Sequence, residues 1–434
     1  QDLDIHVNGA EINFNRLDGS YIGRRYGDSS DEPVSLKNIA YDFTDVVAPS
    51  GSIRSLVISN ANLTGTATTP ANGNEIAHGG QREFVEYNYG TISDIVVKDD
   101  STLGSAGLVY QNGDVSENIV NETGRTTDKT YKDWDQRNIY EIKTTIHYTV
   151  DEKVEQGKIQ NCIIQDSTIK EGAGIVWRNK GGNIQSSKVR NCTQIGHSGF
   201  VAYNQSTSVQ APTTVVIYQY WYDGDQSDAK NRVSDEYVKR KEWPTRNESG
   251  RVSVNVDSII NNCQVIDCTV TTNGFVGENS VNTQGSAGST QGSSGVARIQ
   301  NCQVYGATSY GELVVGGLDG TSGGVSKAAG FAGINGKGAE ITDCSVTGNV
   351  QGLSEAAGFV RSNAGTISGS YANTNVSVKA DTGVSFAGFA LTNSGTIEKS
   401  HSLGTLTNKG RAGDNQRASG FVIRNADGDN SGAI

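Results

Sequence analysis

The chain has no methionine and only 5 prolines in 434 residues. With proline so scarce, its 54 glycines do not belong to a disordered Pro/Gly tract. No apolar run approaches the roughly 20 residues needed to cross a bilayer, and no signal peptide is visible. We therefore expect no membrane contact within this segment. Many tight turns between short strands explain the glycine content better than flexible linkers do.

Clustered positive charge is also missing. The formal net charge is −11, which argues against nucleic acid and anionic lipid as general partners because both need grouped Lys and Arg. No nucleophile elbow, phosphate-binding loop or dinucleotide fingerprint is present. A zinc protease needs two histidines in H-E-x-x-H, and no histidine pair has that spacing. We expect no catalytic residues and no enzyme activity. The histidines are His6, His78, His147, His197 and His401.

What the chain does contain is a repeat. One unit reads Gly, a large apolar residue, Val or Ala, two variable residues, and Asn. The last four copies begin 28, 30 and 32 residues apart, which indicates a stacked repeat architecture. The eight copies begin at Gly107, Gly174, Gly199, Gly274, Gly330, Gly358, Gly388 and Gly420.

A second unit follows most copies, with a small residue, Ile, and then Cys or Ser three positions after the Ile. Gly51-Ser52-Ile53 and Gly90-Thr91-Ile92 look like earlier members, although Leu56 and Ile95 fill the Cys/Ser position. The apolar residues alternate or fall in short runs bounded by turn formers, which is typical of strands. We predict an inward-facing column of these isoleucines beside the Cys/Ser position. Its members are Ile159, Ile260, Ile299, Ile341, Ile367 and Ile397.

Strands that recur every 28 to 32 residues with only turns between them can stack in parallel, coil on coil. The fold class that we predict is therefore all-β, a parallel β-solenoid (β-helix) with two long insertions from one edge. Glycine at fixed places suits positive φ angles and close packing at its corners. The asparagine that closes each unit suits a corner too, since it tolerates left-handed geometry and its amide can bond local backbone.

The two units together resemble the GLUG repeat, found in large bacterial surface proteins and in the immunoglobulin A1 proteases of streptococci. The resemblance covers 90–204, 259–304 and 330–434. It implies a solenoid architecture and says little about activity. In that protease family, the repeats accompany a separate zinc-protease domain. The chain stops in the middle of a repeat, so we expect it to be a segment of a longer protein.

The six cysteines are spaced as stacked core positions rather than as metal pairs. Cys and Ser interchange at one position of the second unit, and Cys192 and Cys268 share another with Ser167. Buried free thiols are the main interpretation, because free cysteine behaves as a small hydrophobe. The even count leaves disulfides between neighbouring coils as an alternative. The first position is taken by Cys162, Cys263, Cys302 and Cys344, and elsewhere by Ser187, Ser370 and Ser400.

Two long insertions, 113–156 and 205–258, leave the repeat from the same corner. We divide the chain into an N-terminal β-rich region with possible capping coils (1–89) and a GLUG-like solenoid that carries both insertions (90–434). Within the second insertion, 213–222 and 252–256 predict strands and 225–243 predicts a short helix. Insertions from one corner emerge along one side of a solenoid, where they often form a binding surface.

The candidate ligand-binding residues lie in these insertions. Their aromatic side chains either form the insertions' own small cores or are exposed to a partner. The candidates are Trp134, Trp221 and Trp243, with Tyr220 and Tyr222. No metal site is expected apart from a weak calcium candidate with alternating oxygen ligands, which lacks the distal Glu. That candidate comprises Asn425, Asp427, Asp429 and Ser431.

These features predict a non-enzymatic extracellular or cell-surface module, an adhesin or stalk that presents a binding surface on its insertions. Its partner would be a glycan or protein of a host or neighbouring cell. No cofactor is expected, with calcium as the one possibility. Two alternatives remain open: the non-catalytic solenoid region of a large secreted metalloprotease, and a structural subunit that self-associates into a surface fibre.

Overall fold

The computed structural model describes the backbone of much of the chain, and within it the side chains of most solenoid coils. Described backbone covers 11–15, 21–25, 34–37, 45–47, 52–59, 62–63, 84–104, 106–113, 120–134, 137–150, 156–170, 172–193, 195–223, 238–240, 245–281, 295–310, 327–381, 383–410 and 416–425. Side chains are described at 52–55, 57–58, 84–104, 106–113, 123–128, 143–147, 156–170, 172–193, 195–207, 256–281, 295–307, 327–381, 383–410 and 416–425.

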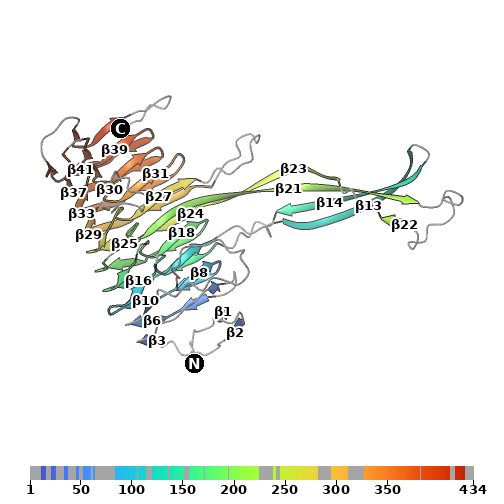
Figure 1. The fold of residues 1–434 in the computed structure, drawn as a ribbon, viewed down its shortest axis with the longest axis horizontal. Coiled ribbons are helices and arrows are strands. Elements are labelled where there is room, and N and C mark those ends of the chain that lie inside the picture. Colours follow the sequence, from blue (N-terminus) through green and yellow to red (C-terminus); the bar gives the residue numbers. More distant parts are fainter. Residues whose placement is uncertain are drawn as a thin grey trace, which may run out of the picture.

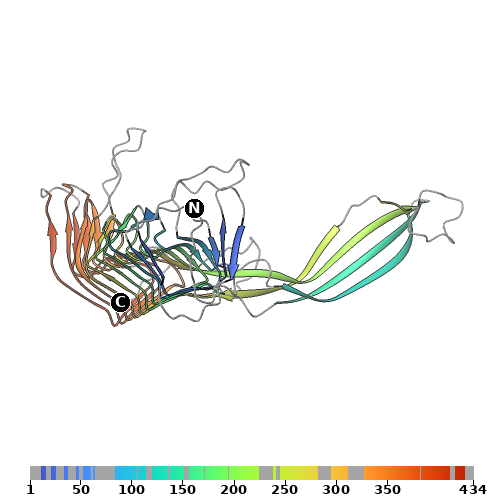
Figure 2. The same cartoon turned by 90° about the horizontal axis from the view of Figure 1, so that it is seen from below.

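The predicted architecture is confirmed. The described residues form a parallel β-solenoid without helices, and its coils stack from the N-terminal to the C-terminal end (Figure 1). A long arm projects from the side of the stack (Figure 2). Three long sheets run along the solenoid, and each coil contributes a strand to each of them.

The isoleucine sheet is built from the second sequence unit. Its strands pair in parallel and in register, so that Ile53, Ile92 and Ile159 stack on one another and the column continues to Ile397. All six isoleucines predicted to form the column are buried, as expected. The strands are β5 (Ser52–Arg54), β9 (Thr91–Ser93), β15 (Lys158–Gln160), β19 (Asn183–Gln185), β24 (Ser258–Asn261), β28 (Ala297–Gln300), β32 (Glu340–Thr342), β36 (Thr366–Ser368) and β40 (Thr396–Glu398).

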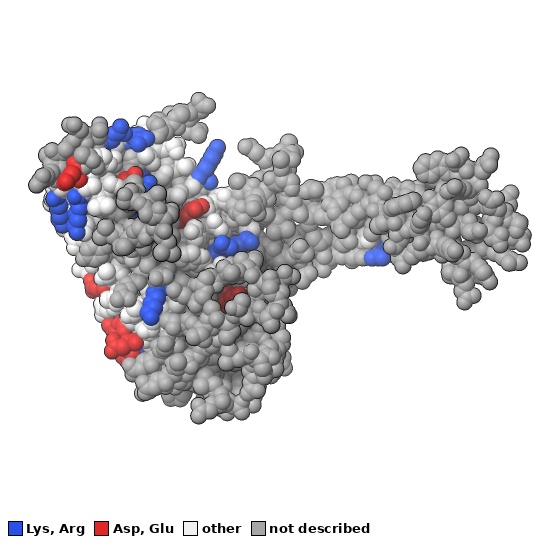
Figure 3. Space-filling model, in the orientation of Figure 1, with Lys and Arg blue, Asp and Glu red and all other residues white. Residues whose placement is uncertain are grey.

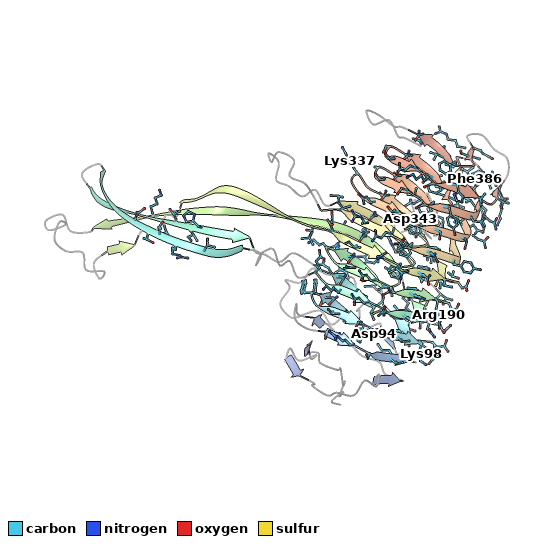
Figure 4. The ribbon with its side chains drawn as sticks, turned by 180° about the vertical axis from the view of Figure 1, so that it is seen from behind. Asp94, Lys98, Arg190, Lys337, Asp343 and Phe386 are labelled. Carbon is cyan, nitrogen blue, oxygen red and sulfur yellow. The ribbon has the colours of Figure 1, made fainter. Side chains whose placement is uncertain are left out.

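The valine sheet follows around a sharp corner. The corner residue of each coil has a positive φ, including Asp94 (58°) and Asp343 (52°), which occupy the same place in distant coils (Figure 4). Asn, Asp and Gly predominate there because they tolerate this conformation. The strands are β3 (Val34–Lys37), β6 (Leu56–Ser59), β10 (Val96–Lys98), β16 (Ile163–Gln165), β20 (Lys188–Arg190), β25 (Gln264–Ile266), β26 (Thr269–Val270), β29 (Gln303–Tyr310), β33 (Ser345–Gly352), β37 (Tyr371–Val378), β41 (His401–Leu403) and β42 (Leu406–Asn408).

The asparagine sheet contains the first sequence unit. Antiparallel β1 and β2 sit at its N-terminal end, and the other strands of the stack are parallel. Its strands are β1 (Glu11–Asn15), β2 (Tyr21–Arg25), β4 (Asp45–Val47), β8 (Val85–Asn88), β12 (Val109–Asn112), β18 (Val176–Lys180), β21 (Val201–Asp223), β27 (Val276–Val281), β31 (Ala332–Asn335), β35 (Val360–Asn363), β39 (Ala390–Asn393) and β44 (Val422–Asn425).

Two short sheets fill the remaining side of the coils. One is formed by β7 (Asn62–Leu63), β11 (Thr102–Leu103) and β17 (Thr168–Ile169), and the other by β30 (Lys327–Ala329), β34 (Glu355–Ala357), β38 (Ser385–Ala387) and β43 (Arg417–Ser419). Every pairing within these two sheets is parallel.

The core repeats in columns. Six phenylalanines from Phe200 to Phe421 stack with ring centroids 4.7–4.9 Å apart, so each coil continues the ring stack of the last. The glycine before each of the first five rings is needed for close approach; a Cβ at Gly330, for example, would overlap the carbonyl oxygen of Gly358. Among the described glycines that begin the first sequence unit, only Gly107 has a positive φ. The stacked rings and the closely packed glycines together explain why most copies of the first sequence unit begin with Gly-Phe.

The asparagine closing each unit matches the sequence-based expectation only in part: its amide does bond local backbone, as Asn179 Nδ2 does at 3.1 Å from the Gly182 carbonyl, but its backbone is not left-handed. These residues are strand residues without positive φ, and they form a continuous side-chain ladder. Each Nδ2 donates to the Oδ1 of the next coil at 2.7–2.9 Å. The prediction of left-handed geometry is therefore wrong, because the ladder satisfies the buried amides from coil to coil. The ladder runs through Asn88, Asn112, Asn179, Asn204, Asn279, Asn335, Asn363, Asn393 and Asn425.

All six cysteines are buried free thiols, as the main interpretation of the sequence predicted. The backbone N–H of Cys162 donates to Ser187 Oγ at 3.1 Å, and that of Cys263 donates to Cys302 Sγ at 3.4 Å. Cys192 donates in the same way to Cys268 Sγ at 3.4 Å. A serine hydroxyl and a cysteine sulfur therefore both accept a hydrogen bond from the backbone N–H of a neighbouring coil, which explains why Cys and Ser interchange.

Candidate functional site

The two insertions combine into one arm. β13 (Val120–Trp134) pairs antiparallel with β14 (Arg137–Val150), and β14 pairs antiparallel with the outer part of β21. On its other edge, β21 pairs with β23 (Thr245–Val256) and with β22 (Val238–Arg240). We use "the arm" for β13, β14, β22, β23 and residues 208–223 of β21. The prediction that both insertions leave one edge is confirmed.

The predicted ligand-binding aromatics belong to the arm where the backbone is described. Trp134 ends β13, and Trp221 lies near the end of β21, flanked by Tyr220 and Tyr222. Register sets Tyr140 opposite both Tyr131 and Trp221. The side chains of these residues lie outside the described part, and so does the whole of Trp243.

The helix predicted over 225–243 is wrong where it can be checked, because Val238–Arg240 is strand β22. Its partner Trp221–Asp223 already extends the sheet, so edge pairing prevails over the local helical pattern. The rest of the predicted helix lies outside the described residues.

Of the four residues of the calcium candidate, the structure describes only Asn425. Asn425 ends the asparagine ladder, with its Oδ1 accepting from Asn393 Nδ2 at 2.7 Å. Asp427, Asp429 and Ser431 lie outside the described residues. Among the residues that are described, no group of three or more His, Cys, Asp or Glu side chains is placed to hold a metal ion.

A second surface, missed by the sequence-based reasoning, lies on the outer face of the asparagine sheet. The two variable residues of each unit face outward there, and four successive coils place an aromatic among them. These half-buried residues are Tyr87, Tyr110, Trp177 and Tyr203. Burial, followed by the charge of Glu86, raises the pKa of Tyr87 to about 12, so its phenol stays protonated.

The centre of this surface is a cluster of three rings, which we call the aromatic cluster: Trp177, His197 and Tyr203. Ring centroids lie 5.3 Å apart for Trp177–His197, 5.6 Å for Trp177–Tyr203 and 5.7 Å for His197–Tyr203. Nδ1 of His197 lies 2.8 Å from Ser198 Oγ. Burial, and after it the charge of Arg361, lowers the pKa of His197, so the ring is neutral near pH 7. Trp177 packs edge-to-face on both His197 and Tyr203, which fixes the orientations of the rings.

Glycines make room for the polar side of the cluster. The imidazole of His197 lies over Gly277, where a Cβ would overlap it. Over Gly333, an ideal Cβ would lie 3.0 Å from Arg361 Nη2 and 2.8 Å from Asn273 Oδ1. The guanidinium of Arg361 therefore faces the imidazole across two coils that carry no outer side chain at this column.

Three buried polar atoms at this surface have no hydrogen-bond partner within the described part of the chain: Arg178 Nε, Arg361 Nε and Asn273 Oδ1. Burial lowers the pKa of Arg361, while the charge of Glu355 raises it. Glu355 itself pairs with Lys327 at 3.2 Å. Ring faces, two guanidiniums and an amide oxygen thus share this surface with the His197 imidazole.

Charges on the described surface are mixed. On the face drawn in Figure 3, basic and acidic side chains are interspersed and form no extended patch of one sign. Among the residues that the structure describes, no helix is long and apolar enough to cross a membrane.

The chain matches no protein family, no curated protein and no solved structure. The GLUG resemblance therefore stays a prediction from the sequence, and a proposed function depends on the residues and their geometry.

Proposed function

We propose that the protein is a non-enzymatic binding module of an extracellular or cell-surface bacterial protein, in which the solenoid is the scaffold and the arm carries the principal contact surface. One observation carries this proposal. The strand β21 is 23 residues long and belongs to both parts. Its first residues pair in parallel with β18 and β27, and its outer part pairs antiparallel with β14 and β23.

A shared strand makes the arm an extension of the scaffold. A binding surface on a flexible linker has to be ordered on contact, and that ordering reduces affinity. Here the backbone hydrogen bonds of one sheet run from the core of the solenoid into the arm (Figure 1). Contacts made at the arm's distal end are thus held at a fixed distance and orientation from the stack.

Composition supports a contact role for the distal end. The register aligns Tyr131, Tyr140 and Trp221 across three neighbouring strands, with Arg240 opposite Trp221 on the fourth. Tyr, Trp and Arg are the residues that most often dominate the energy of interfaces. The partner that we propose is a glycan or protein of a host or neighbouring cell.

The competing proposals are the non-catalytic region of a secreted metalloprotease and a subunit of a surface fibre. A spacer or fibre subunit would need only the stacked coils, and a fibre would use their ends. A projection of five strand segments from the side of the stack serves neither purpose, which favours the binding module. The GLUG-like repeat units are compatible with all three.

The test replaces the arm with short turns at 114–155 and 208–255, which keeps Val256 and the solenoid strands. Fluorescently labelled protein is added to cultured epithelial cells, and bound protein is measured by flow cytometry. We expect the replacement to reduce binding at least tenfold while the circular dichroism of the solenoid persists.

Trp221→Ala should reduce binding in the same direction. Tyr371→Ala is the matched control, because Tyr371 is an exposed aromatic on the valine sheet, stacked on His401 at 5.3 Å. Unchanged binding by the arm-replaced protein would refute the proposal and leave the spacer or fibre subunit as the better account.

A further inference from the structure

We propose that the outer face of the asparagine sheet around the aromatic cluster binds an acidic oligosaccharide, one built from sugars that carry a carboxylate. This site lies on the solenoid and is independent of the arm. Its ligand is inferred from three features of the described residues: the order of the rings, the unpaired polar groups, and the charge.

The rings occupy two adjacent columns on four successive coils. In-register pairing places Tyr87, Gln111, Arg178 and Tyr203 in one column on successive coils. Tyr110 and Trp177 each precede a member of that column and therefore fill the neighbouring one. Parallel strands lie about 4.8 Å apart, so the columns extend along the stack with side chains at regular intervals. The flat, C–H-rich face of a pyranose ring stacks on such side chains.

The polar groups beside the rings lack partners. Asn273 is 2 % exposed, and its Nδ2 donates to the His197 carbonyl at 3.3 Å while its Oδ1 has no donor among the described residues. Nε of Arg361 and Nε of Arg178 also lack acceptors there. Native proteins satisfy nearly all buried polar groups, and three of the eight unsatisfied side-chain atoms of the described residues gather at this surface, which points to a missing ligand or water there.

A sugar is suited to this mixture of groups. Its hydroxyls can accept from guanidinium N–H groups while the flat face of its ring covers an aromatic side chain. Peptide carboxylates could meet the arginines, but they would leave the ring faces without a flat partner.

Charge selects an acidic sugar over a neutral one. Within the described part of the chain, neither Arg178 nor Arg361 forms an ion pair within 4.0 Å. The imidazole of His197 is neutral near pH 7, so it adds no charge to the site. A guanidinium recognises a carboxylate with two parallel N–H···O bonds, and it does so most strongly where water is partly excluded.

The test titrates the full chain with trigalacturonic acid and, separately, with neutral maltotriose, following tryptophan fluorescence and calorimetry. We expect the acidic trisaccharide to bind more tightly than the neutral one, and its affinity to fall with added salt because exposed charge interactions are screened. Trp177→Ala should weaken binding at least tenfold, and Trp177→Phe should retain part of it. Arg361→Gln should remove most of the preference for the acidic sugar.

Matched variants separate this site from the arm and from a folding defect. Tyr371→Ala, the aromatic beside His401 on the valine sheet, should bind the acidic trisaccharide unchanged, and so should the arm-replaced protein. Circular dichroism and the unfolding midpoint verify the fold of every variant. Absence of binding by either sugar, or equal binding by Trp177→Phe, Trp177→Ala and the wild type, would overturn the proposal. Tighter binding of an aspartate oligopeptide than of trigalacturonic acid would overturn the assignment to a sugar.

Discussion

The solenoid and the arm use opposite ways of building a sheet. Most solenoid strands span two to eight residues and pair in parallel with strands one coil away, as β16 with 3 residues and β33 with 8 do. Apart from the three-residue β22, the arm uses strands of 12 to 23 residues, and these pair antiparallel within the arm. Parallel stacking needs every coil to repeat the same inward residues, whereas an antiparallel hairpin needs only complementary neighbours.

This difference determines where each region can change. A substitution in the solenoid affects a column, because the side chain contacts its copies above and below. A substitution in the arm affects one or two cross-strand pairs. The predictions below test that contrast, beginning with the largest expected effect.

The first prediction compares two buried isoleucines. Ile367 is 0 % exposed in the isoleucine column, and Ile146 is 5 % exposed in the arm. Ile367→Ala should cost about 2–5 kcal/mol of unfolding free energy, because the column cannot collapse around the cavity without shifting its neighbours. Ile146→Ala should leave the unfolding midpoint of the solenoid unchanged and instead increase hydrogen exchange in β13, β14 and the outer part of β21.

Denaturant unfolding monitored by circular dichroism, with hydrogen exchange resolved by peptide, separates the two effects. A loss under about 0.5 kcal/mol for Ile367→Ala would show that the column is misplaced. A drop in solenoid stability for Ile146→Ala would show that the two regions unfold as one unit.

The second prediction concerns the asparagine ladder. Asn279 accepts from Asn204 Nδ2 at 2.7 Å and donates to Asn335 Oδ1 at 2.9 Å, so Asn279→Ala removes the ladder partner of both of these atoms. We expect a loss of about 1–3 kcal/mol, the cost of stranding buried polar groups. Asn425→Ala is the matched control, since Asn425 is exposed at the ladder's end and should cost less. Equal losses of unfolding free energy at both positions would show that a hydrogen bond to each neighbouring coil stabilises the protein no more than a bond at the end of the ladder.

Sequence alone predicted the solenoid columns well, because copies of a residue type at one spacing imply one environment. The isoleucine column and the Cys/Ser position follow this logic. The same reasoning failed for asparagine, because this residue type is found both in turns and in stacked amide ladders. Only the stacking of the coils in the structure distinguishes the two. A copy of the first unit, Phe84 to Asn88, was also missed, because Glu83 stands where the other copies have glycine.

The surface site was harder to predict for a related reason. Trp177 and Tyr203 occupy variable positions of the first sequence unit, so a search for repeated residue types does not single them out. The presence of an aromatic residue in four successive copies was nevertheless a usable signal. His197, Asn273 and Arg361 lie in three different coils, and only the three-dimensional stack brings them together. The pairing of β14 with β21 likewise needed the structure, since the sequence located both insertions on one side without giving their register.

The last prediction uses the Cys/Ser position to ask how far the columns tolerate exchange. Burial raises the pKa of the Cys162 thiol from 9.0 to about 12. In the unfolded chain this thiol loses its proton near pH 9, while in the folded chain it keeps the proton to about pH 12. The folded state therefore binds more protons in that window, and the stability contributed by the neutral thiol declines as the pH rises through it. Ser187 fills the same position one coil away, fully buried, with its Oγ accepting from the Cys162 N–H at 3.1 Å. Cys162→Ser should consequently change the unfolding free energy by less than about 1 kcal/mol at neutral pH and should lose less stability than the wild type at about pH 11. Denaturant unfolding of both proteins at the two pH values measures the difference, and titration with a thiol reagent checks that Cys162 reacts only after unfolding. Rapid modification of the native thiol, or the same alkaline loss in both proteins, would contradict the buried position of Cys162 in the column.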